Sequence, residues 1–562
     1  MAFVGREFAL QTRHHTAMQR STGTPHAWPQ PAHGPALRPW CCTRRHWLAQ
    51  ALRSAFAVPV AAALGPWLGT PAHAQTVALP ALGDGGDMTL AVERELGDQI
   101  ARAIYRDPAY LDDPALAELL QALWQPLLAG ARQRGELSDE LAQRYAWRLL
   151  LGRDPSVNAF ALPGGYLGIH LGLIGVTQRA DELASVLAHE MSHVTQRHIA
   201  RLLTRQSQQA PLVLAAMILG ALAASAAKNA DIAGAAVAGG QALAVQGQLN
   251  FSRDMEREAD RIGLAVLQAA GFDGQGFIGM FERLQQSARL NDDGSFPYLR
   301  SHPLTTERIA DMRARLQLQP ANPPTASVSP HWYAAMAARA RVLADPAPDR
   351  LRTHARARRP EDPATAYAAA LAHGLLREPA AALDAQAALQ RSLPTDDAAA
   401  QRAARWLRLE LLTLLHPEAT LDPAARASLP TLTRAALDDG TRAGLLLAAQ
   451  AATRGGDGEL RRACAQRLQA WCVQRPDDAQ AWEVLAGVQR ALGQPVRAGR
   501  AEGEARLALL DETGALDRFR ATQRLAAQQR SDDWQELAVL DARVRHVEAV
   551  LREREAALRR RP

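Results

Sequence analysis

Apolar residues recur at helical spacing along most of the chain. In residues 89–150 they fall every three or four positions, as in LAVERELGDQIARAIY, and this period predicts amphipathic helices. Helical spacing returns at residues 251–272 and continues to the C-terminus in short Ala/Leu/Arg-rich units that Pro and Gly separate. The pattern therefore predicts a mainly α fold.

One stretch departs from the helical period. Residues 155–175 read PSVNAFALPGGYLGIHLGLIG, and their short apolar alternations lie on both sides of Pro163, Gly164 and Gly165. Such a pattern predicts two strands joined by a turn, and it is the only convincing β signal in the sequence. We expect an α+β domain with a small sheet, followed by an all-α domain.

The C-terminal helical units show a weak internal repeat. The clearest unit is residues 476–505, with the spacing of a tetratricopeptide motif at Trp482, Leu485, Ala486, Ala498 and Ala505. Residues 366–394 form a weaker unit. We predict a helical-repeat domain, and a bundle of helices without repeats is the alternative.

The positive charge of the chain is confined to its N-terminus. The whole chain has a formal charge of +6, and residues 1–74, with seven arginines and one acid, carry the same +6. The remainder is therefore balanced, which argues against a nucleic-acid partner. Within 1–74, Arg44 and Arg45 precede an apolar run too short to span a bilayer, and Ala72-His73-Ala74 follows. This predicts an export signal, either general secretory or twin-arginine.

Residues 211–249 are rich in Ala and Gly and nearly free of charge. Their first apolar arm is about 17 residues long, below a comfortable membrane span. A buried helical hairpin near the site is the simpler interpretation. An arm that contacts a membrane surface or the substrate is the alternative.

The most specific chemical motif is His189-Glu190-x-x-His193, which lies in a predicted helix. Residues four apart share one helix face, so both imidazoles can reach one metal ion while Glu190 lies beside them as a base. Zinc needs a third protein ligand and a fourth position for water. His198 is turned about 140° from His193 on a straight helix, so we expect it at the surface or behind the ligands.

A candidate third ligand lies in the string RDMEREADRIG. Glu256 and Asp260 share a helix face there, which suits a carboxylate ligand and a carboxylate that orients a ligand histidine. Glu258 points away from Asp260 and is expected to be solvated. Arg308 is expected to pair with a local carboxylate.

These motifs together resemble a known family. H-E-x-x-H, the later E-x-E-A-D-R-x-G string, SHPLTTERIADM and VNAFALPGG are similar to the zinc peptidases of the CAAX prenyl protease/HtpX type, over roughly residues 88–316. With an export signal and a repeat domain, the chain most resembles the periplasmic members that act in β-barrel assembly. The multi-span membrane segments of other members are missing.

The resemblance implies one zinc ion held by His189, His193 and Glu256, with Glu190 as catalytic base. It places His302 and Asn158 at positions that stabilise the oxyanion and hold the substrate; His302 could instead gate the fourth zinc position. The strand at Asn158 would bind a peptide by strand addition.

The function expected from this resemblance is hydrolysis of misassembled outer-membrane proteins in the periplasm, with the repeat domain docking clients or the β-barrel assembly machinery. A chaperone or adaptor with latent proteolysis is the alternative. The expected division of the chain is an export signal (1–74), a linker (75–88), a zinc metalloprotease domain (89–316), a Pro-rich linker (317–330) and a repeat domain (331–562).

Overall fold

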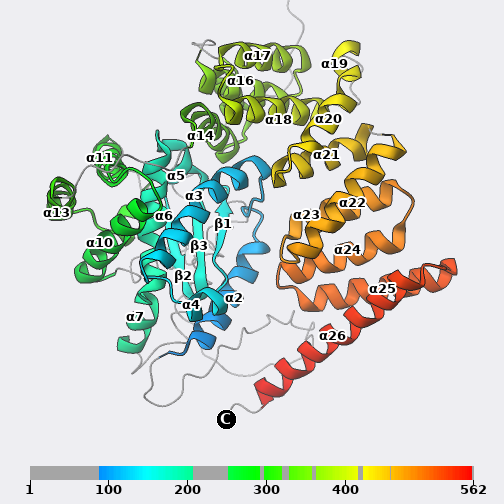
Figure 1. The fold of residues 1–562 in the computed structure, drawn as a ribbon, viewed down its shortest axis with the longest axis horizontal. Helices are drawn as coiled ribbons and strands as arrows, with labels where there is room; N and C mark the ends of the chain where they lie inside the picture. Colours follow the sequence, from blue (N-terminus) through cyan, green and yellow to red (C-terminus); the bar gives the residue numbers. More distant parts are fainter. Residues whose placement is uncertain are drawn as a thin grey trace, which may run out of the picture. The chain divides into compact units, whose positions relative to one another are not determined.

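The structure, a computed structural model, confirms a mainly α protein (Figure 1). It describes residues 88–206, 251–290, 296–318, 328–356, 362–415, 422–455 and 457–559. The predicted export signal and the Ala/Gly-rich arm lie outside these residues, as does most of each predicted linker. Among the described helices, none combines the length and the apolar character that a bilayer crossing needs.

Three helices precede the sheet in the described part of the chain. They are α2 (Leu90–Tyr105), α3 (Pro114–Gln133) and α4 (Asp139–Arg144). Each begins at a side chain that accepts a hydrogen bond from its first turn: Thr89, Asp113 and Ser138. The apolar face of α3, from Leu116 to Leu128, is buried, as the helical period predicts.

The sheet has three strands rather than the two that the sequence predicted. Strand order is β1 (Arg148–Gly152), β3 (Tyr166–His170) and β2 (Ala159–Leu162), with β1 parallel and β2 antiparallel to β3. The prediction of helices throughout 89–150 was wrong at β1. Its short apolar run, RLLLG, lacks the alternation that marks a half-buried strand, so periodicity could not separate it from a helix end.

The predicted turn between β2 and β3 is confirmed. Residues Pro163–Gly165 form one turn of 3-10 helix between the two strands. Gly165 has φ of 86°, and a Cβ there would lie 2.8 Å from Cβ of Tyr145. Glycine therefore lets the turn approach α4 closely, and β2 is left at the edge of the sheet.

The helix with the histidine motif is central to this half of the structure. α6 (Ala180–Thr195) packs against β2, α10 (Arg253–Ala269) and α11 (Gln275–Leu290), and its residues from Glu182 to Thr195 are all buried. A Cβ on Gly263 would come within 3.2 Å of the Ala188 backbone, so glycine permits α6 and α10 to approach closely.

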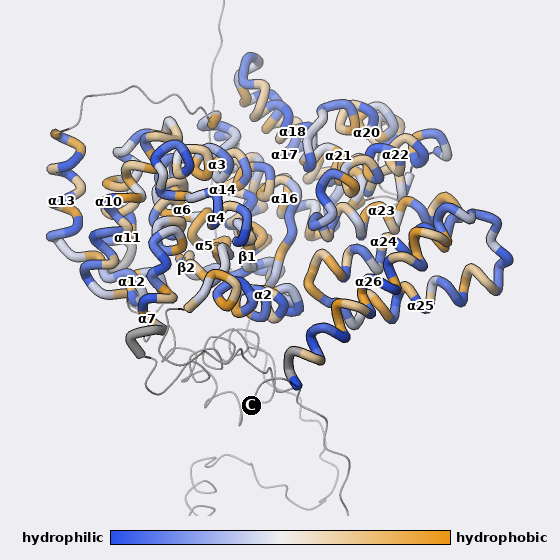
Figure 2. Tube along the Cα trace, turned by 60° about the horizontal axis from the view of Figure 1, so that its bottom comes forward, coloured by the Kyte–Doolittle hydropathy of each residue, from blue (hydrophilic) through white to orange (hydrophobic). Residues whose placement is uncertain are grey.

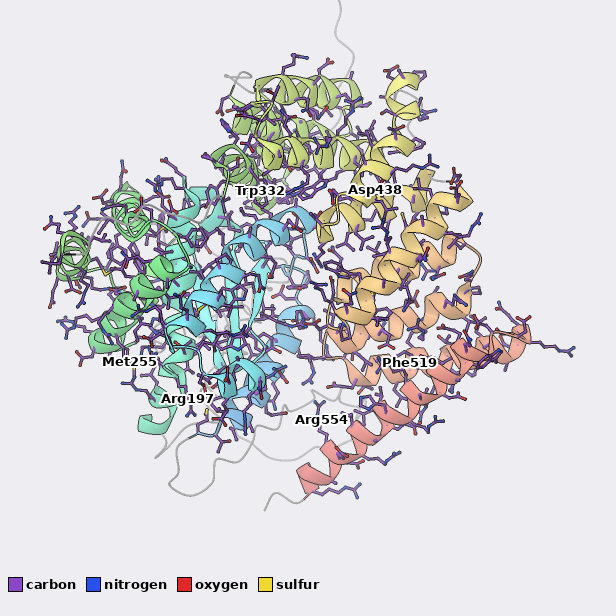
Figure 3. The ribbon with its side chains drawn as sticks, viewed as in Figure 1. Arg197, Met255, Trp332, Asp438, Phe519 and Arg554 are labelled. Carbon is purple, nitrogen blue, oxygen red and sulfur yellow. The ribbon has the colours of Figure 1, made fainter. Side chains whose placement is uncertain are left out.

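Short elements connect and flank these helices. They are α5 (Leu171–Val176), α7 (His198–Gln206), α12 (Pro297–Ser301) and α13 (Thr306–Gln317). The break between α6 and α7 is at Arg197, whose φ is 51°, and Figure 3 marks its position. Arg197 donates hydrogen bonds to Glu93 and to the carbonyl of Met88, which hold this uncommon conformation.

The remaining described residues are helical. The helices are α14 (Pro330–Ala344), α15 (Pro348–Ala355), α16 (Pro363–Leu375), α17 (Pro379–Ser392), α18 (Ala398–Leu415), α19 (Pro423–Ala427), α20 (Leu429–Asp438), α21 (Arg442–Gly455), α22 (Gly458–Gln474), α23 (Ala479–Ala491), α24 (Pro495–Ala508), α25 (Glu512–Gln529) and α26 (Trp534–Arg559). Many begin with proline, whose missing N–H costs nothing at that position. Blue and orange stretches alternate along them in Figure 2, as amphipathic helices require.

The two predicted repeat units each form a pair of packed helices. Residues 476–505 hold α23 and α24, and residues 366–394 hold α16 and α17. A Cβ on Gly503 would lie 2.2 Å from the ring of Phe519, so α24 and α25 pack through a glycine. α14 and α21 also pack against α3, and the described residues from 88 to 559 all belong to one compact unit. The division into two domains stays a prediction.

Candidate metal centre

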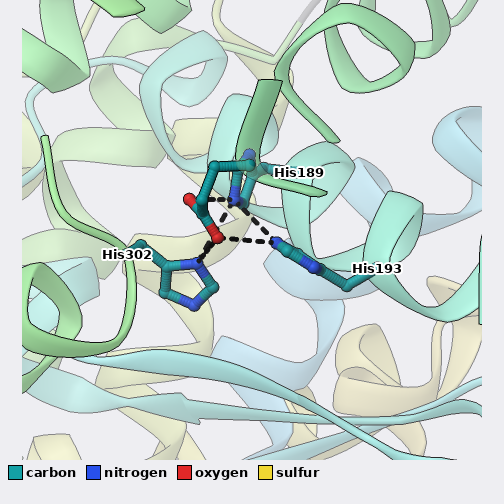
Figure 4. Close-up of side chains that lie close together, drawn as sticks. His189, His193 and His302 are labelled. Carbon is teal, nitrogen blue, oxygen red and sulfur yellow. Dashed lines mark hydrogen bonds and ion pairs between the residues drawn. The ribbon is translucent and has the colours of Figure 1, made fainter. Parts of the chain in front are cut away.

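α6 presents both histidines of the motif to the same point. His189 and His193 are buried on adjacent turns, and their Nε2 atoms lie 3.0 Å apart. Their outer nitrogens have other neighbours: Nδ1 of His189 lies 3.0 Å from Oδ1 of Asp260, and Nδ1 of His193 lies 2.9 Å from Nδ1 of His198. The two Nε2 atoms are thus the ones left to face each other (Figure 4).

α10 brings a carboxylate to this point. Ser252 caps the helix, and Glu256 in its first turn is 2% exposed. Its Oε2 lies 3.5 Å from Nε2 of His189, and its Oε1 lies 3.5 Å from Nε2 of His193. The structure therefore brings together the three residues that the sequence proposed as ligands, from two helices.

His302 completes the group. It follows α12, and its Nδ1 lies 3.0 Å from Oε1 of Glu256 and 3.4 Å from Nε2 of His189. The donor atoms of His189, His193, Glu256 and His302 all lie within 4.8 Å of one another. His302 was predicted near the site, either to stabilise the oxyanion or to gate the metal, and the structure puts its ring among the candidate ligands.

The geometry of these atoms fits a zinc ion. Two ligands of tetrahedral zinc, with bonds of about 2.0–2.1 Å, are separated by about 3.3 Å. The separations of 3.0, 3.5 and 3.5 Å among His189, His193 and Glu256 bracket that value. Two imidazole lone pairs that face each other inside a protein repel unless a cation or a proton lies between them. Imidazole and carboxylate together are a donor set suited to zinc.

The buried carboxylates at the centre also favour a positive charge there. Burial alone would lower the pKa of His189, but Asp260 and Glu256 outweigh it and raise this pKa to about 10. Burial would raise the pKa of Glu256, but His302 and His189 hold it well below its usual range. Without a metal ion, the neighbouring carboxylates keep His189 protonated. A bound divalent ion would supply the positive charge in place of that proton.

Asp260 supports His189 from behind, as the sequence proposed. Its two oxygens accept hydrogen bonds of 2.7 and 2.8 Å from Arg308, which also lies 2.8 Å from Oε2 of Glu256. Burial would raise the pKa of Asp260, but Arg308 and His189 lower it. The expectation that Arg308 pairs with a local carboxylate is confirmed.

Glu190 is placed to carry a proton. It is fully buried, and its Oε2 accepts a hydrogen bond of 2.9 Å from the backbone N–H of Ala161 in β2. Its Oε1 has no hydrogen-bond partner among the described residues and lies 3.5 Å from Nε2 of His302. Burial raises the pKa of Glu190, and Glu256 adds to the rise, while His302 and His189 oppose it. A raised pKa suits a group that accepts and returns a proton near neutrality.

Asn158 lies outside the metal cluster. It precedes β2, is 3% exposed, and its backbone carbonyl accepts a hydrogen bond from His170 in β3. Its side-chain Oδ1 is buried without a partner among the described residues. Backbone groups of an antiparallel strand alternate in direction, so Ala159 and Ala161 point theirs toward the free edge.

The structure adds neighbours to the proposed ligands. His198, expected at the surface or behind the ligands, is fully buried behind His193, which is the second of these two positions. Glu258, expected to be solvated, accepts hydrogen bonds from His198 and Arg201. The ring of Phe251 is stacked on His193, with centroids 3.9 Å apart. Helical-wheel angles could not distinguish the two expected positions of His198, because the turn at Arg197 ends the helix on which the angle was counted.

Comparison with known proteins adds relatives to this geometry. Residues 132–316 match the model of peptidase family M48. The chain is 37% identical over 278 residues to a putative beta-barrel assembly-enhancing protease of Vibrio cholerae, covering 49% of this chain and 54% of that protein. The beta-barrel assembly-enhancing protease of Escherichia coli K12 is 34% identical over 254 residues, with 44% and 50% covered.

A mitochondrial relative is more distant. The metalloendopeptidase OMA1 of Saccharomyces cerevisiae is 28% identical over 233 residues, covering 39% of this chain and 63% of that protein. The chain spans about half the length of the bacterial relatives it matches. The segment matched to the family contains all four residues of the metal centre.

Proposed function

We propose that this chain, whose residues 132–316 form a peptidase family M48 domain, is an exported zinc endopeptidase that degrades misassembled outer-membrane proteins. The match to peptidase family M48 and the metalloendopeptidase among the relatives support zinc-dependent hydrolysis of protein substrates. The observation that carries the proposal is Glu190, which lies between the metal centre and the free edge of β2.

Zinc held by His189, His193 and Glu256 would supply Lewis acidity, lowering the pKa of a bound water to about 7. The carboxylate of Glu190 is held in place by the N–H of Ala161, which donates a hydrogen bond to Oε2. Its Oε1 is left available to accept a proton from water. Oε1 accepts the proton of the attacking water and returns it to the nitrogen of the leaving amine. One C–O bond forms and the peptide C–N bond breaks.

The edge strand would hold the substrate. A peptide added beside β2 can pair with the outward backbone groups of Ala159, in a register that carries its scissile bond past Glu190. Because such pairing uses backbone atoms, it depends little on the substrate sequence. A site of this kind can bind different misfolded proteins through their exposed, extended segments. The unpartnered Oδ1 of Asn158 would accept an N–H of the same peptide.

His302 is proposed to act on the carbonyl side of the reaction. Its Nε2 lies 3.5 Å from Oε1 of Glu190. A protonated His302 ring at this position could donate a hydrogen bond to the oxyanion that forms from the carbonyl of the scissile peptide bond. The alternative is that His302 holds the fourth metal position and must move before substrate enters. Its Nδ1, 3.0 Å from Glu256, supports the second role as well.

The remaining parts of the proposal concern the cell. A periplasmic location rests on the export signal predicted in residues 1–74. Docking to the β-barrel assembly machinery through the helices of residues 331–562 rests on the names of the relatives, which call them assembly-enhancing proteases. The same names favour a second candidate function, a chaperone or adaptor role in assembly that does not need cleavage.

Replacement of Glu190 by Gln tests the proposed reaction. The change keeps size and the contact with Ala161 but removes the proton acceptor, so we expect cleavage of an unfolded outer-membrane protein to fall by roughly two to four orders of magnitude. Bound zinc, measured by atomic absorption, should stay at one equivalent. Glu282→Gln, an exposed glutamate of α11, is the matched control and should cleave as the wild type does.

Cleavage that persists in Glu190→Gln would refute the role of this residue. The same variant separates the two candidate functions. If outer-membrane proteins still assemble normally in cells that carry only Glu190→Gln, the assembly role does not depend on proteolysis.

A further inference from the structure

His198 and Glu258 lie behind the metal centre, and the proposed reaction uses neither. The left-handed turn at Arg197, labelled in Figure 3, separates α6 from α7. After this turn His198 lies against His193. The side chain of His198 is fully buried, whereas that of Glu258 is 30% exposed. A polar ring at this depth needs partners for both nitrogens.

Both nitrogens of His198 have such partners. Its Nδ1 lies 2.9 Å from Nδ1 of His193, and its Nε2 lies 3.0 Å from Oε2 of Glu258. Nη1 of Arg201 donates a hydrogen bond of 3.0 Å to the same oxygen of Glu258. The contacts form a chain from the metal centre to the surface: His193, His198, Glu258 and Arg201.

The tautomers along this chain follow from the metal centre. Nε2 of His193 points at His189 and Glu256, so it must be free of a proton to bind a metal. The neutral ring then carries its proton on Nδ1 and donates it to Nδ1 of His198. His198 accepts there, so its own proton is on Nε2, where it is donated to Glu258. One arrangement of protons satisfies all three residues.

We propose that His198, oriented by Glu258, is a positioning residue that holds His193 in the tautomer and ring orientation needed to bind the metal. This inference rests on the proposed metal centre and deepens it. His189 has its outer nitrogen against a carboxylate directly, at Asp260, whereas His193 reaches its carboxylate through an interposed imidazole. Phe251, stacked on the face of the His193 ring, limits the ring's remaining rotation.

Zinc affinity of purified full-length variants tests this proposal without reference to peptidase activity. His198→Leu fills the space but accepts no hydrogen bond, and we expect its zinc Kd, measured by competition with a chromophoric chelator, to rise roughly 10–100-fold. His198→Asn keeps an acceptor near the position of Nδ1 and loses the reach to Glu258. It should recover most of the affinity, to within about fivefold of the wild type.

Two further variants complete the series. Glu258→Gln, a change at a partly exposed side chain, weakens the bond that fixes His198 and should raise the zinc Kd several-fold, roughly the lower end of that range. His373→Asn is the matched control, since His373 pairs with Glu378 within the helical region and has no part in the metal centre. Its zinc Kd should equal that of the wild type.

The outcomes are distinct. A zinc Kd in His198→Leu and Glu258→Gln within about twofold of the wild type would overturn the proposal. The proposal would also be overturned if His198→Leu and His198→Asn lost the same zinc affinity and showed the same drop in Tm, measured for the metal-free protein in chelator. That pattern would mean that His198 acts through packing alone. If His198→Leu does not fold, Glu258→Gln against His373→Asn decides. A wild-type protein that binds no zinc refutes the proposed metal centre itself.

Discussion

Two sets of charged groups in this protein, each buried or partly buried, differ in how completely their polar atoms are paired. The first set comprises two arginine clusters: Arg339 with Asp113 and Glu410, and Arg442 with Asp112 and Asp478. Each guanidinium lies between two carboxylates, with N···O distances of 2.6–2.9 Å around Arg339 and 2.8–3.2 Å around Arg442. The second set is the metal centre.

The charged groups of each arginine cluster serve as hydrogen-bond partners for one another. Asp112 and Asp113 precede α3, whereas the two arginines belong to α14 and α21, so each cluster joins segments far apart in the sequence. The planar guanidinium donates to two carboxylates at once, which leaves few of its hydrogens unpaired. The hydrogen-bonding groups of each cluster are therefore paired with one another.

The metal centre leaves some of its polar atoms without such partners. The Nε2 atoms of His189 and His193 face each other at 3.0 Å, and Oε1 of Glu190 has no hydrogen-bond partner among the described residues. Burying unpaired groups costs free energy, so a protein that keeps them in place gains something else from them. The contrast teaches that burial of charge alone does not mark a functional site, whereas donor atoms converging without a partner do.

The largest effect is expected from removing a ligand of the metal centre. Glu256→Ala deletes one of three proposed protein ligands, and we expect the zinc Kd to rise on the order of a thousandfold, about a third of a typical zinc binding free energy. Chelator competition measures it, and peptidase activity should be lost with the metal. Glu307→Ala, an exposed glutamate that pairs with Arg257, is the control. If Glu256→Ala retains zinc, Glu256 is not a metal ligand, and the contrast between the metal centre and the arginine clusters fails.

Removing the charge at the middle of an arginine cluster should act on stability instead. Arg339→Met leaves the buried Asp113 and the partly exposed Glu410 without their partner, and we expect the free energy of unfolding to fall by about 3–5 kcal/mol. Urea unfolding measures this loss, while zinc stoichiometry of the folded protein should be unchanged. Arg352→Met, in an exposed pair with Asp349, should leave stability nearly unaltered. A small effect at Arg339 would mean that water enters the cluster.

The smallest effect concerns acid stability. Burial would raise the pKa of Asp478, but the hydrogen bonds and charge of Arg442 lower it below its ordinary value of 3.8. A lowered folded pKa adds stability that is present above pH 3.8 and is lost as the pH falls through that lowered value. Asp478→Asn should therefore be less stable than the wild type at pH 7, with a difference that shrinks below about pH 4. Urea unfolding of both proteins at pH 7 and below about pH 4 tests this prediction. If the difference in the free energy of unfolding is the same at both pH values, Arg442 does not lower the pKa of Asp478.

The sequence alone established what is local. Spacing of four on a helix put His189 and His193 on one face, and spacing of four within α10 put Glu256 and Asp260 on another. Alternation around Pro163–Gly165 revealed β2 and β3. Each of these inferences needs only neighbours within a few residues, where backbone geometry alone dictates which side chains meet.

Tertiary structure decided what depends on contacts distant in sequence. β1 is a strand because β3 pairs with it, and its own apolar run could not reveal this. His198 lies behind His193 because Arg197, held by Glu93 and Met88 more than a hundred residues away, turns the chain there. Tertiary hydrogen bonds can hold a backbone conformation that local preference disfavours. The hydrophobic periodicity of the sequence carries no information about such contacts.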